Sequence, residues 1–563
     1  MSWPVFGSLR GYDRRWLRGD LVAGLTVWAV LVPEALAYAT IAGVSPVVGL
    51  YAAPGALLLY AAFGSSRHLV TGPMSATAAL SAAAVAELAT SGSSRFVQLT
   101  TALAITTGVL AVLAGLLRLG FLASFISEPV LKGFIIGLAL TIVAGQLPKL
   151  FGVEGGSGDF FEKLWGVLGD LGDTSRLTLA VGLASLALVL GLRRLAPVVP
   201  GSLAAVLAGI VAVRVFGLDA HGVAIVGRID SGLPSPGLPG VAAADYLSLA
   251  PAAAGVMLVG FAEGLGAAKT YAARHHYEVD ANRELLGLGA ANLGAGLSRG
   301  MVVNGSLSKT AVNGSAGARS QVSGLVVAAL TVLTLAFLTG LFESLPEATL
   351  AAVVIAAVVE LVDIPALVDL YRVATRQLRG IYGVAARPDF LAALAALLGV
   401  LVFDTLPGLF IGVLVSLLLL LYRASRPHVA VLGQVPGASG QYVDIRRHPE
   451  NRQVPGIVIL RLESGLFFAN ADTLRDAVRA HAFRDGIRAV VLDAETIPSV
   501  DVTAARMLVQ LDDELRRRGV RLVVARDIGQ VRDVLRRTEA DGPLLTAYPT
   551  VRQAVEALQS PAG

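Results

Sequence analysis

The feature that most constrains this chain is a series of long apolar runs, which begins near residue 21 and continues to residue 421. Short segments rich in Gly, Pro or Arg separate the runs. The chain has 563 residues, of which 55% are hydrophobic and 15% charged, and its mean hydropathy is +0.70. Soluble globular proteins do not have this composition. The runs predict roughly twelve to fourteen membrane spans of about twenty residues each, so we expect a polytopic α-helical membrane protein.

Arginines flank the apolar region on both sides. Lys and Arg near span ends favour the cytoplasmic side of a membrane. We therefore expect both chain ends to be cytoplasmic, the number of spans to be even, and the protein to lie in the cell inner (plasma) membrane. No short apolar segment with a small-residue cleavage site opens the chain, so we expect no removable signal peptide. The flanking residues are Arg10, Arg14, Arg15 and Arg18 before the first run, and Arg423 and Arg426 after the last.

Composition and spacing disfavour several classes of function. The chain has no cysteine, which excludes disulfides, thiolate metal sites and cysteine nucleophiles. No arrangement of nucleophile, base and orienting residue stands out, so we do not expect an enzyme. No metal-ligand spacing and no nucleotide-binding glycine loop stands out either. We expect no cofactor, no metal and no nucleic-acid partner.

Two short segments, residues 71–77 and 304–310, interrupt apolar runs and restart them as helices. In hydrocarbon, a broken helix leaves backbone N–H groups unpaired unless the break lines a cavity or is buried in protein. Interrupted helices in corresponding positions of two halves point to the ligand site of a secondary transporter. If each is the third of seven helices in its half, the chain divides near residue 240, after a segment rich in Pro and Gly. The expected repeats are residues 20–240 and 241–425.

The first restart follows Gly72 and Pro73. A proline at the first helical position is tolerated, and the free N–H groups behind it carry the positive end of the helix dipole. Such a helix start holds anions, and Ser75 and Thr77 would add hydroxyl donors. The alternative is a proline-kinked helix in which both hydroxyl groups bond their own backbone.

The second restart surrounds Lys309 with Ser306, Ser308 and Thr310. A lysine at the start of a membrane helix either snorkels to the interface or faces a polar cavity. In a cavity, Lys309 would supply a full positive charge beside a second helix start. Two opposed helix starts and one ammonium group make a site for a small anion.

Two carboxylates lie inside apolar helices. A carboxylate such as Glu263 in mid-span costs several kcal/mol unless it is paired or protonated. Burial favours its neutral form and a nearby ammonium such as Lys309 favours its charged form, which suits a proton that comes and goes with an anion. A structural ion pair is the alternative. Glu34 is the second carboxylate, and Tyr38 lies four residues on, on the same helix face; Tyr38 either contacts the ligand or packs in the core.

After Arg426 the pattern changes, because charged residues become frequent. Three apolar segments predict strands and three amphipathic segments predict helices. Their alternation implies a small α/β domain with a mostly parallel sheet. The predicted strands are 456–462, 489–493 and 520–525, and the predicted helices are 471–483, 502–518 and 528–538. The expected regions are a cytoplasmic N-terminal segment (1–19), a transmembrane transporter domain (20–425) and a cytoplasmic domain (426–563).

Taken together, these segments resemble the SulP anion-permease family, known in animals as solute carrier family 26. Residues 33–51 and 64–73 are similar to its sulfate-transporter signature, and residues 268–272 and 277–285 to the segment around its eighth span. The resemblance covers nearly the whole chain. It implies fourteen membrane segments in two inverted seven-helix repeats, with core and gate subdomains as in uracil permeases. The soluble domain resembles a STAS domain.

The resemblance places an anion between the starts of the third and tenth helices. Ser75 matches the third-helix position, and Ser306 and Ser308 match the tenth. Lys309 falls where many members carry an arginine, so the positive charge is kept but the planar, forked guanidinium group is lost. Glu263 matches the acid of the plant proton-coupled sulfate transporters, which favours symport over exchange.

Glu34 departs from the family pattern, which usually has Gln after this proline. If Glu34 and Glu263 both face the site, Lys309 cannot neutralise two carboxylates and a dianionic substrate, so protons or another cation must enter with the anion. In the STAS domain, Thr503 aligns with the phosphorylatable serine of anti-sigma-factor antagonists. The alternative there is that Asp501 only caps the helix.

We therefore expect a secondary active transporter of small inorganic anions, above all proton-coupled sulfate uptake by an elevator-type mechanism. The family resemblance implies a homodimer, and cytoplasmic regulators would act through the STAS domain. The alternatives are a bicarbonate or dicarboxylate transporter coupled to sodium or protons, an anion exchanger or channel on the same scaffold, and a membrane-anchored signalling protein. The expected substrate-binding residues are Tyr38, Ser75, Thr77, Ser306, Ser308, Lys309 and Thr310, with Glu263 and Glu34 for ion coupling and Thr503 for regulation.

Overall fold

The computed structural model divides the chain into two compact units, which we describe separately. The membrane unit comprises Met1–Leu370 and Asp389–Ser416, and the C-terminal unit comprises Tyr371–Pro388 and Leu417–Gly563. Arg10, one of the arginines that precede the first apolar run, lies outside the described residues. The structure describes residues 5–9, 11–121, 127–154, 156, 158–196, 199–227, 232–359, 362–376, 388–403, 405–438, 440–538 and 546–560.

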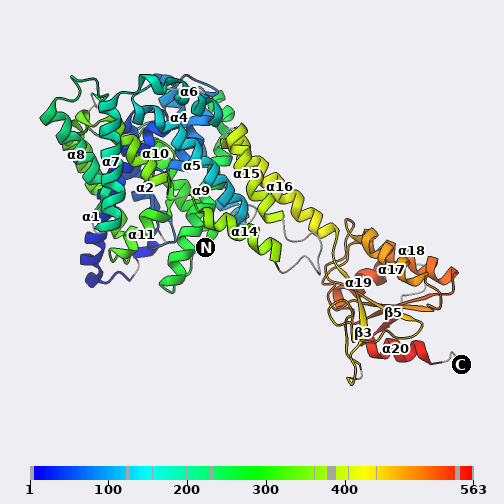
Figure 1. The fold of residues 1–563 in the computed structure, drawn as a ribbon. Helices are drawn as coiled ribbons and strands as arrows, with labels where there is room; N and C mark the ends of the chain where they lie inside the picture. The colour runs from blue at the N-terminus through cyan, green and yellow to red at the C-terminus, as the bar shows by residue number, and fades with distance from the viewer. Residues whose placement is uncertain are drawn as a thin grey trace. The chain divides into compact units, whose positions relative to one another are not determined.

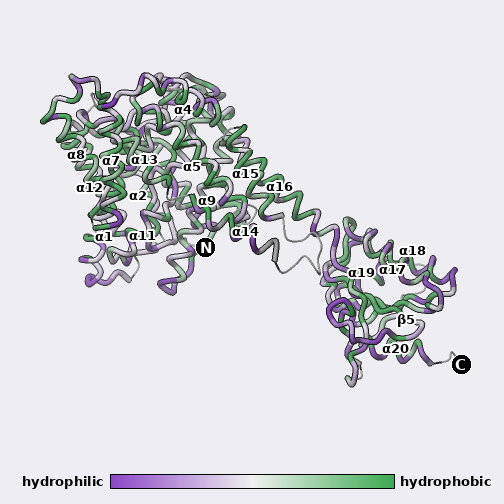
Figure 2. Tube along the Cα trace, in the orientation of Figure 1, coloured by the Kyte–Doolittle hydropathy of each residue, from purple (hydrophilic) through white to green (hydrophobic). Residues whose placement is uncertain are grey.

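Apolar helices build the membrane unit (Figure 1). Among the described residues, seven helices are long and apolar enough to cross a membrane, and five shorter apolar helices accompany them. Figure 2 shows hydrophobic residues along most of these helices. The first eight helices are α1 (Leu17–Ile41), α2 (Pro46–Phe63), α3 (Ser75–Ala86), α4 (Ser94–Leu116), α5 (Glu128–Phe151), α6 (Phe160–Gly169), α7 (Arg176–Leu195) and α8 (Gly201–Phe216). The next eight are α9 (Ala243–Arg274), α10 (Ala281–Leu297), α11 (Leu307–Ser315), α12 (Val322–Phe337), α13 (Glu347–Val359), α14 (Ile364–Arg376), α15 (Pro388–Phe403) and α16 (Thr405–Ser425).

The two predicted helix restarts are present as α3 and α11. They are 12 and 9 residues long, too short to cross a bilayer alone at 1.5 Å per residue. Each is the third helix of its series, since α9 begins at Ala243, just after the predicted division of the chain. The count of fourteen spans and the inverted relation of the two halves stay predictions.

The helices of the membrane unit pack in two groups. In one group, α10 packs on α2 and α4, α9 packs on α4, and α1 packs on α2, α11 and α12. In the other, α13 packs on α5 and α7, and α7 packs on α8. Small residues allow close approach in lipid: a Cβ atom on Gly49 of α2 would collide with the Ala35 carbonyl of α1. The two groups also contact each other, because α1 packs on α8 and α13 and α3 packs on α5; their assignment to core and gate subdomains stays a prediction.

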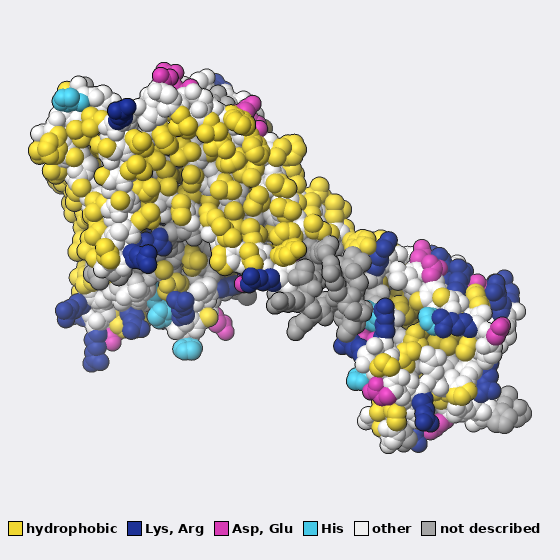
Figure 3. Space-filling model, in the orientation of Figure 1, with side chains coloured by type: hydrophobic (Ala, Val, Ile, Leu, Met, Phe, Trp, Pro, Cys, Tyr) yellow, Lys and Arg dark blue, Asp and Glu magenta, His cyan; other side chains and the backbone are white. Residues whose placement is uncertain are grey.

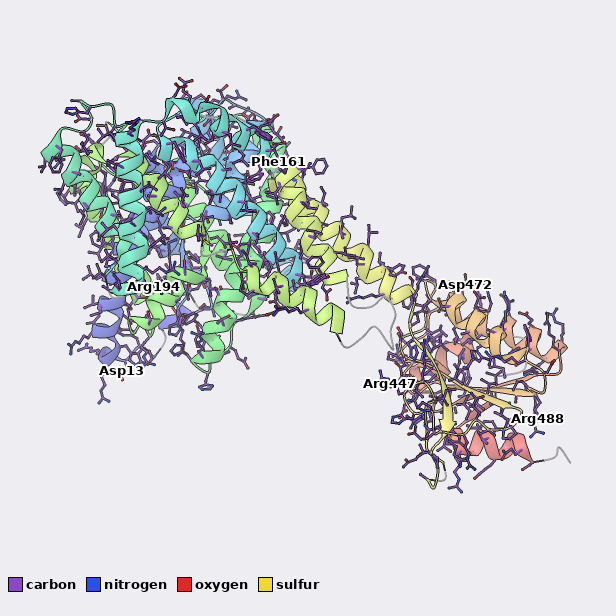
Figure 4. All side chains as sticks on the ribbon, viewed as in Figure 1. Asp13, Phe161, Arg194, Arg447, Asp472 and Arg488 are labelled. Atoms are coloured by element: carbon purple, nitrogen blue, oxygen red, sulfur yellow. The ribbon has the colours of Figure 1, made fainter. Side chains whose placement is uncertain are left out.

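Charged side chains gather at the ends of the membrane unit. Figure 3 shows a broad hydrophobic surface on this unit, with Lys and Arg concentrated toward the end where α1 begins. Figure 4 places Asp13 and Arg194 at that end and Phe161 at the opposite end. A hydrophobic belt between charged ends is the surface that a bilayer requires.

The C-terminal unit contains a six-stranded sheet in the order β4-β3-β5-β6-β7-β8. Strands β5 to β8 are parallel neighbours, while β3 runs antiparallel to β4 and β5. The unit has an α/β fold with a mostly parallel sheet, as predicted. Its elements are β3 (Val429–Gln434), β4 (Tyr442–Asp444), β5 (Ile457–Leu462), α17 (Ala471–Ala482), β6 (Ala489–Asp493), α18 (Val502–Arg517), β7 (Arg521–Ala525), α19 (Gly529–Thr538), β8 (Thr546–Tyr548) and α20 (Val551–Gln559).

Strand alternation builds a hydrophobic core on each face of this sheet. In β5, Val458 and Leu460 contribute to the core that contains α17, α18 and α19, whereas Ile457 and Ile459 contribute to the core that contains α20. Successive side chains of a strand point to opposite faces, so a strand buried on both faces reads as a continuous apolar run. This explains why the three central strands were predictable.

Candidate functional site

The two interrupted segments meet as a short antiparallel ladder inside the membrane unit. Strand β1 (Val70–Gly72) pairs with β2 (Asn304–Ser306), with Thr71 opposite Gly305. Both strands are buried throughout. The pairing gives hydrogen-bond partners to backbone groups that a broken helix would leave free in hydrocarbon. Helices α3 and α11 then leave the ladder at opposite ends.

Lys309, in the first turn of α11, links three elements. Its Nζ donates to the Pro73 carbonyl oxygen before α3 at 3.2 Å and lies 2.6 Å from Glu34 Oε2 on α1. The ammonium also lies 5.1 Å from the centre of the Tyr38 ring, a cation–π arrangement. Because the Lys309 side chain is only 1% exposed, the snorkelling alternative does not hold.

The two mid-span carboxylates have different partners. Glu34 pairs with Lys309, whereas Glu263 Oε2 on α9 accepts a hydrogen bond from Asn304 Nδ2 at 3.4 Å. Asn304 Oδ1 accepts in turn from the Gly305 N–H at 2.7 Å, so the amide ties Glu263 to strand β2. The sequence suggested Lys309 as a neighbour of Glu263, but the packing of α1 on α11 pairs this ammonium with Glu34 instead.

The hydroxyl groups at the start of α11 have structural contacts. Ser306 caps the helix, because its Oγ accepts from the Lys309 N–H at 3.3 Å. Ser306 Oγ also lies 3.1 Å from Ser308 Oγ. Thr310 Oγ1 accepts from the Val70 N–H at 3.1 Å, so Thr310 holds strand β1 against α11. The structure therefore brings Ser306, Ser308 and Lys309 together and gives Thr310 a supporting contact.

The hydroxyl groups near α3 divide in a similar way. Ser75 is buried and begins α3, two residues beyond the Pro73 carbonyl that Lys309 contacts. Thr77 Oγ1 donates to the Met74 carbonyl at 3.3 Å, so Thr77 bonds its own backbone, the alternative left open by the sequence. Thr71 Oγ1 is buried and has no hydrogen-bond partner among the described residues.

The sequence did not point to two buried residues that hydrogen-bond the loop before strand β1. Gln321 Nε2 donates to the Ser66 carbonyl at 3.0 Å. Glu284 accepts from Tyr60 Oη at 2.7 Å and from the Ser65 N–H at 2.8 Å. Gln321 precedes α12 and Glu284 lies in the first turn of α10. Their signal in the sequence is a polar side chain at the start of a buried helix, because such a side chain can hydrogen-bond the backbone of a neighbouring loop.

In the C-terminal unit, Thr503 is exposed in the first turn of α18. The preceding Asp501 caps this helix, since its Oδ1 accepts from the Ala504 N–H at 2.8 Å. Asp501 Oδ2 also accepts from the Phe468 N–H at 2.8 Å. The cap is present, and phosphorylation of Thr503 stays a prediction.

The amino-acid sequence matches two family profiles and several curated relatives. Residues 17–381 match the Sulfate permease family, and residues 448–554 match the STAS domain. A protein described as a probable sulfate transporter of Mycobacterium tuberculosis (strain CDC 1551 / Oshkosh) is 40% identical, over 95% of this chain and 93% of the relative. High affinity sulfate transporter 1 of Stylosanthes hamata is 31% identical, over 93% of this chain and 80% of the relative.

Solved structures share the fold. Murine solute carrier 26 family member A9, an anion transporter in the inward-facing state, has a TM-score of 0.88 at 23% identity, over 98% of this chain and 93% of that chain. The transmembrane domain of a cyanobacterium bicarbonate transporter has a TM-score of 0.61 at 23% identity, over 71% and 98% of the two chains. These two likenesses concern the fold alone. With the sequence matches beside them, the conclusion is that this chain belongs to the sulfate permease family, whose members are transporters and not enzymes, and carries a C-terminal STAS domain.

Proposed function

We propose that this chain is a secondary active transporter that takes up sulfate or a similar small oxyanion together with protons. The observation that carries the proposal is Lys309, a buried ammonium between the starts of α11 and α3. Helix starts and an ammonium both attract anions, and an intramembrane charge marks a functional site by default. Relatives described as sulfate transporters support sulfate as the substrate.

The charges around the site support coupling to protons. Lys309 and Glu34 cancel each other, and Glu263 adds a further carboxylate on α9. A sulfate dianion would therefore enter a region that already carries excess negative charge, and uncompensated charge in a poorly solvated interior is very costly. Protons on the carboxylates remove the excess, so proton and sulfate would cross together. In this proposal Glu263 is the acid that couples uptake to the proton gradient.

The proposed mechanism is an elevator-type movement of the helix group containing α1, α3 and α11 against the group containing α5, α7 and α13. The denser packing within each group than between the groups supports it. The proposed protein is a homodimer in the cell inner membrane with both chain ends cytoplasmic. Arg14 and Arg15 before α1 and Arg423 near the end of α16 support this orientation. The STAS domain is the proposed contact for cytoplasmic regulators.

The test is uptake of radiolabelled sulfate by the purified full chain in liposomes, with and without an inward proton gradient. We expect accumulation that depends on the gradient and that unlabelled oxyanions inhibit. Glu263→Gln should accumulate less sulfate under the same gradient but keep exchange of sulfate, because it removes one proton acceptor and its side chain does not contact Lys309. The control Glu347→Gln removes a half-exposed carboxylate that pairs with Lys149 and should behave like the unchanged protein.

Other outcomes would redirect or refute the proposal. If uptake follows a sodium gradient, sodium and not the proton is the coupling ion. If unlabelled bicarbonate or fumarate inhibits uptake more strongly than unlabelled sulfate does, that anion and not sulfate is the preferred substrate. Uptake that is independent of pH and insensitive to all oxyanions would refute the proposal, and currents without accumulation would indicate a channel.

A further inference from the structure

Glu34 places a carboxylate against the ammonium that the site offers to an anion. Glu34 Oε2 lies 2.6 Å from Lys309 Nζ, and the two side chains are 10% and 1% exposed. The Pro73 carbonyl oxygen engages the same ammonium at 3.2 Å. The ammonium therefore already has an ion-pair partner and a hydrogen-bond acceptor within this chain.

We propose that ionised Glu34 is an internal counter-anion, and that Glu34 must take up a proton before an oxyanion can bind Lys309. The inference rests on the proposed function and deepens it, because it adds to the proton on Glu263 a second proton, which anion binding itself requires. Ionised Glu34 would lie beside the oxyanion, and like charges a few ångströms apart repel strongly in a poorly solvated site. Protonated Glu34 has no charge and gains an O–H donor for the oxyanion.

Few ionisable groups surround Glu34. Tyr38 lies one turn further along α1, on the same helix face, and Lys309 faces the carboxylate from α11. Helices α3 and α12 also pack on α1, and neither contains an ionisable side chain. Asp20 is about four turns away along α1 and accepts from the Arg319 N–H at 2.7 Å.

The remaining elements that pack on α1 are α2, α8, α13 and the short helix η2 (Arg14–Trp16), whose arginines precede the first turn of α1. The longer helices carry four ionisable side chains: Tyr51 of α2 is one, and the other three contact partners other than Glu34. In the part of the chain that the structure describes, Lys309 is therefore the charged side chain that contacts Glu34. The three pairs are Tyr60 with Glu284, Glu347 with Lys149 and Arg214 with Ser344.

The two carboxylates thus have separable roles. Glu263 contacts Asn304 of strand β2 and not the ammonium, so its charge affects the anion from a greater distance. Glu34 competes directly with the anion for Lys309. A variant that removes the Glu34 charge should change the pH dependence of binding, whereas a variant that removes the Glu263 charge should chiefly change accumulation.

The test is equilibrium binding of radiolabelled sulfate to the purified full chain in detergent, measured at several pH values. One proton taken up per anion makes the affinity of the unchanged protein fall by up to about tenfold per pH unit as pH rises. Glu34→Gln removes the charge and keeps a carbonyl oxygen for Lys309. This variant should lose the part of the slope that Glu34 causes and bind sulfate more tightly at high pH than the unchanged protein does, while the control Glu347→Gln keeps the whole slope.

A second measurement uses the reciprocity of linked binding. Sulfate added to lightly buffered Glu263→Gln protein should cause proton uptake, and the double variant Glu34→Gln/Glu263→Gln should show none. If Glu34→Gln keeps the original slope, or if sulfate causes no proton uptake in Glu263→Gln protein, the counter-anion role is overturned while the transport proposal stands. If the unchanged protein binds no sulfate at any pH, the proposed function itself fails.

Discussion

Replacement of Lys309 by methionine removes one partner of a buried ion pair and leaves the other in place. Two unit charges 2.6 Å apart attract by about 6 kcal/mol at an effective dielectric constant of about 20. Desolvation of both groups offsets much of this attraction, so the pair itself contributes little net stability. Removal of one partner is different, because it leaves an uncompensated charge on Glu34, which is buried. We expect Lys309→Met to cost about 3–5 kcal/mol.

The assay is a double-mutant cycle on the purified full chain, unfolded in mixed micelles with increasing SDS and followed by circular dichroism. The four proteins are the unchanged chain, Lys309→Met, Glu34→Gln and the double variant. The double variant should be more stable than Lys309→Met alone, because no buried charge remains unpaired. We expect a coupling energy of about 0.5–3 kcal/mol between the two sites, as for directly contacting residues.

Two results would refute this reasoning. A coupling energy near zero would mean that Glu34 and Lys309 do not interact in the folded protein. A double variant as unstable as Lys309→Met would mean that the lysine stabilises the protein through its contact with the Pro73 carbonyl and not by neutralising Glu34.

Three further predictions concern supporting contacts. Gly49→Ala should reduce both stability and sulfate uptake, because the new methyl group would collide with the Ala35 carbonyl and move α2 away from α1. Glu284→Ala should cost about 3 kcal/mol or more in the SDS assay, since it leaves buried donors of Tyr60 and the next loop without an acceptor. Asp501→Ala should cost about 1 kcal/mol through loss of the α18 cap, measured by thermal unfolding of the full chain.

Matched controls make each of these predictions refutable. Gly145→Ala adds a methyl group where no neighbour lies within 4 Å, so equal damage from both glycine variants would contradict the packing argument. Glu278→Ala removes an exposed carboxylate near α10 and should change stability little. Asp513→Ala does the same on the exposed face of α18, and a loss equal to that of Asp501→Ala would show that the cap is unimportant.

The predicted elements differ from the missed ones in how local their signal is. Strands β5, β6 and β7 were predicted because each is an apolar run buried on both faces. Strands β4 and β8 have three residues each and exist through pairing with neighbours, so no local pattern marks them. Strand β3 follows α16 closely, and a short apolar segment beside a long apolar helix is ambiguous. Helix α20 was missed although its apolar face is clear in the structure.

Within the candidate site, too, some features were predictable from the sequence and others were not. The breaks before α3 and α11 and the presence of one lysine beside a helix start follow from residue types in sequence, and the structure has both. The direct contacts of Thr77 and Thr310 were not determined by sequence. Each could equally have faced a ligand, but Thr77 bonds the Met74 carbonyl and Thr310 accepts from strand β1. A hydroxyl group is versatile, and its partner is decided by whichever donor or acceptor the fold brings near it.

The sequence by itself therefore determined that the chain enters a membrane, where its helices must break and that Glu34, Glu263 and Lys309 lie inside apolar segments. These are consequences of chain composition, because hydrocarbon tolerates neither unpaired backbone groups nor free charges. The tertiary structure alone decided which carboxylate meets Lys309. Glu34 and Glu263 were equivalent candidates along the chain, and only the packing of α1 against α11 brings Glu34 to the ammonium while strand β2 holds Glu263 through Asn304. The pairing of Lys309 with one carboxylate depends on contacts between helices far apart in sequence, so a local sequence pattern cannot predict it.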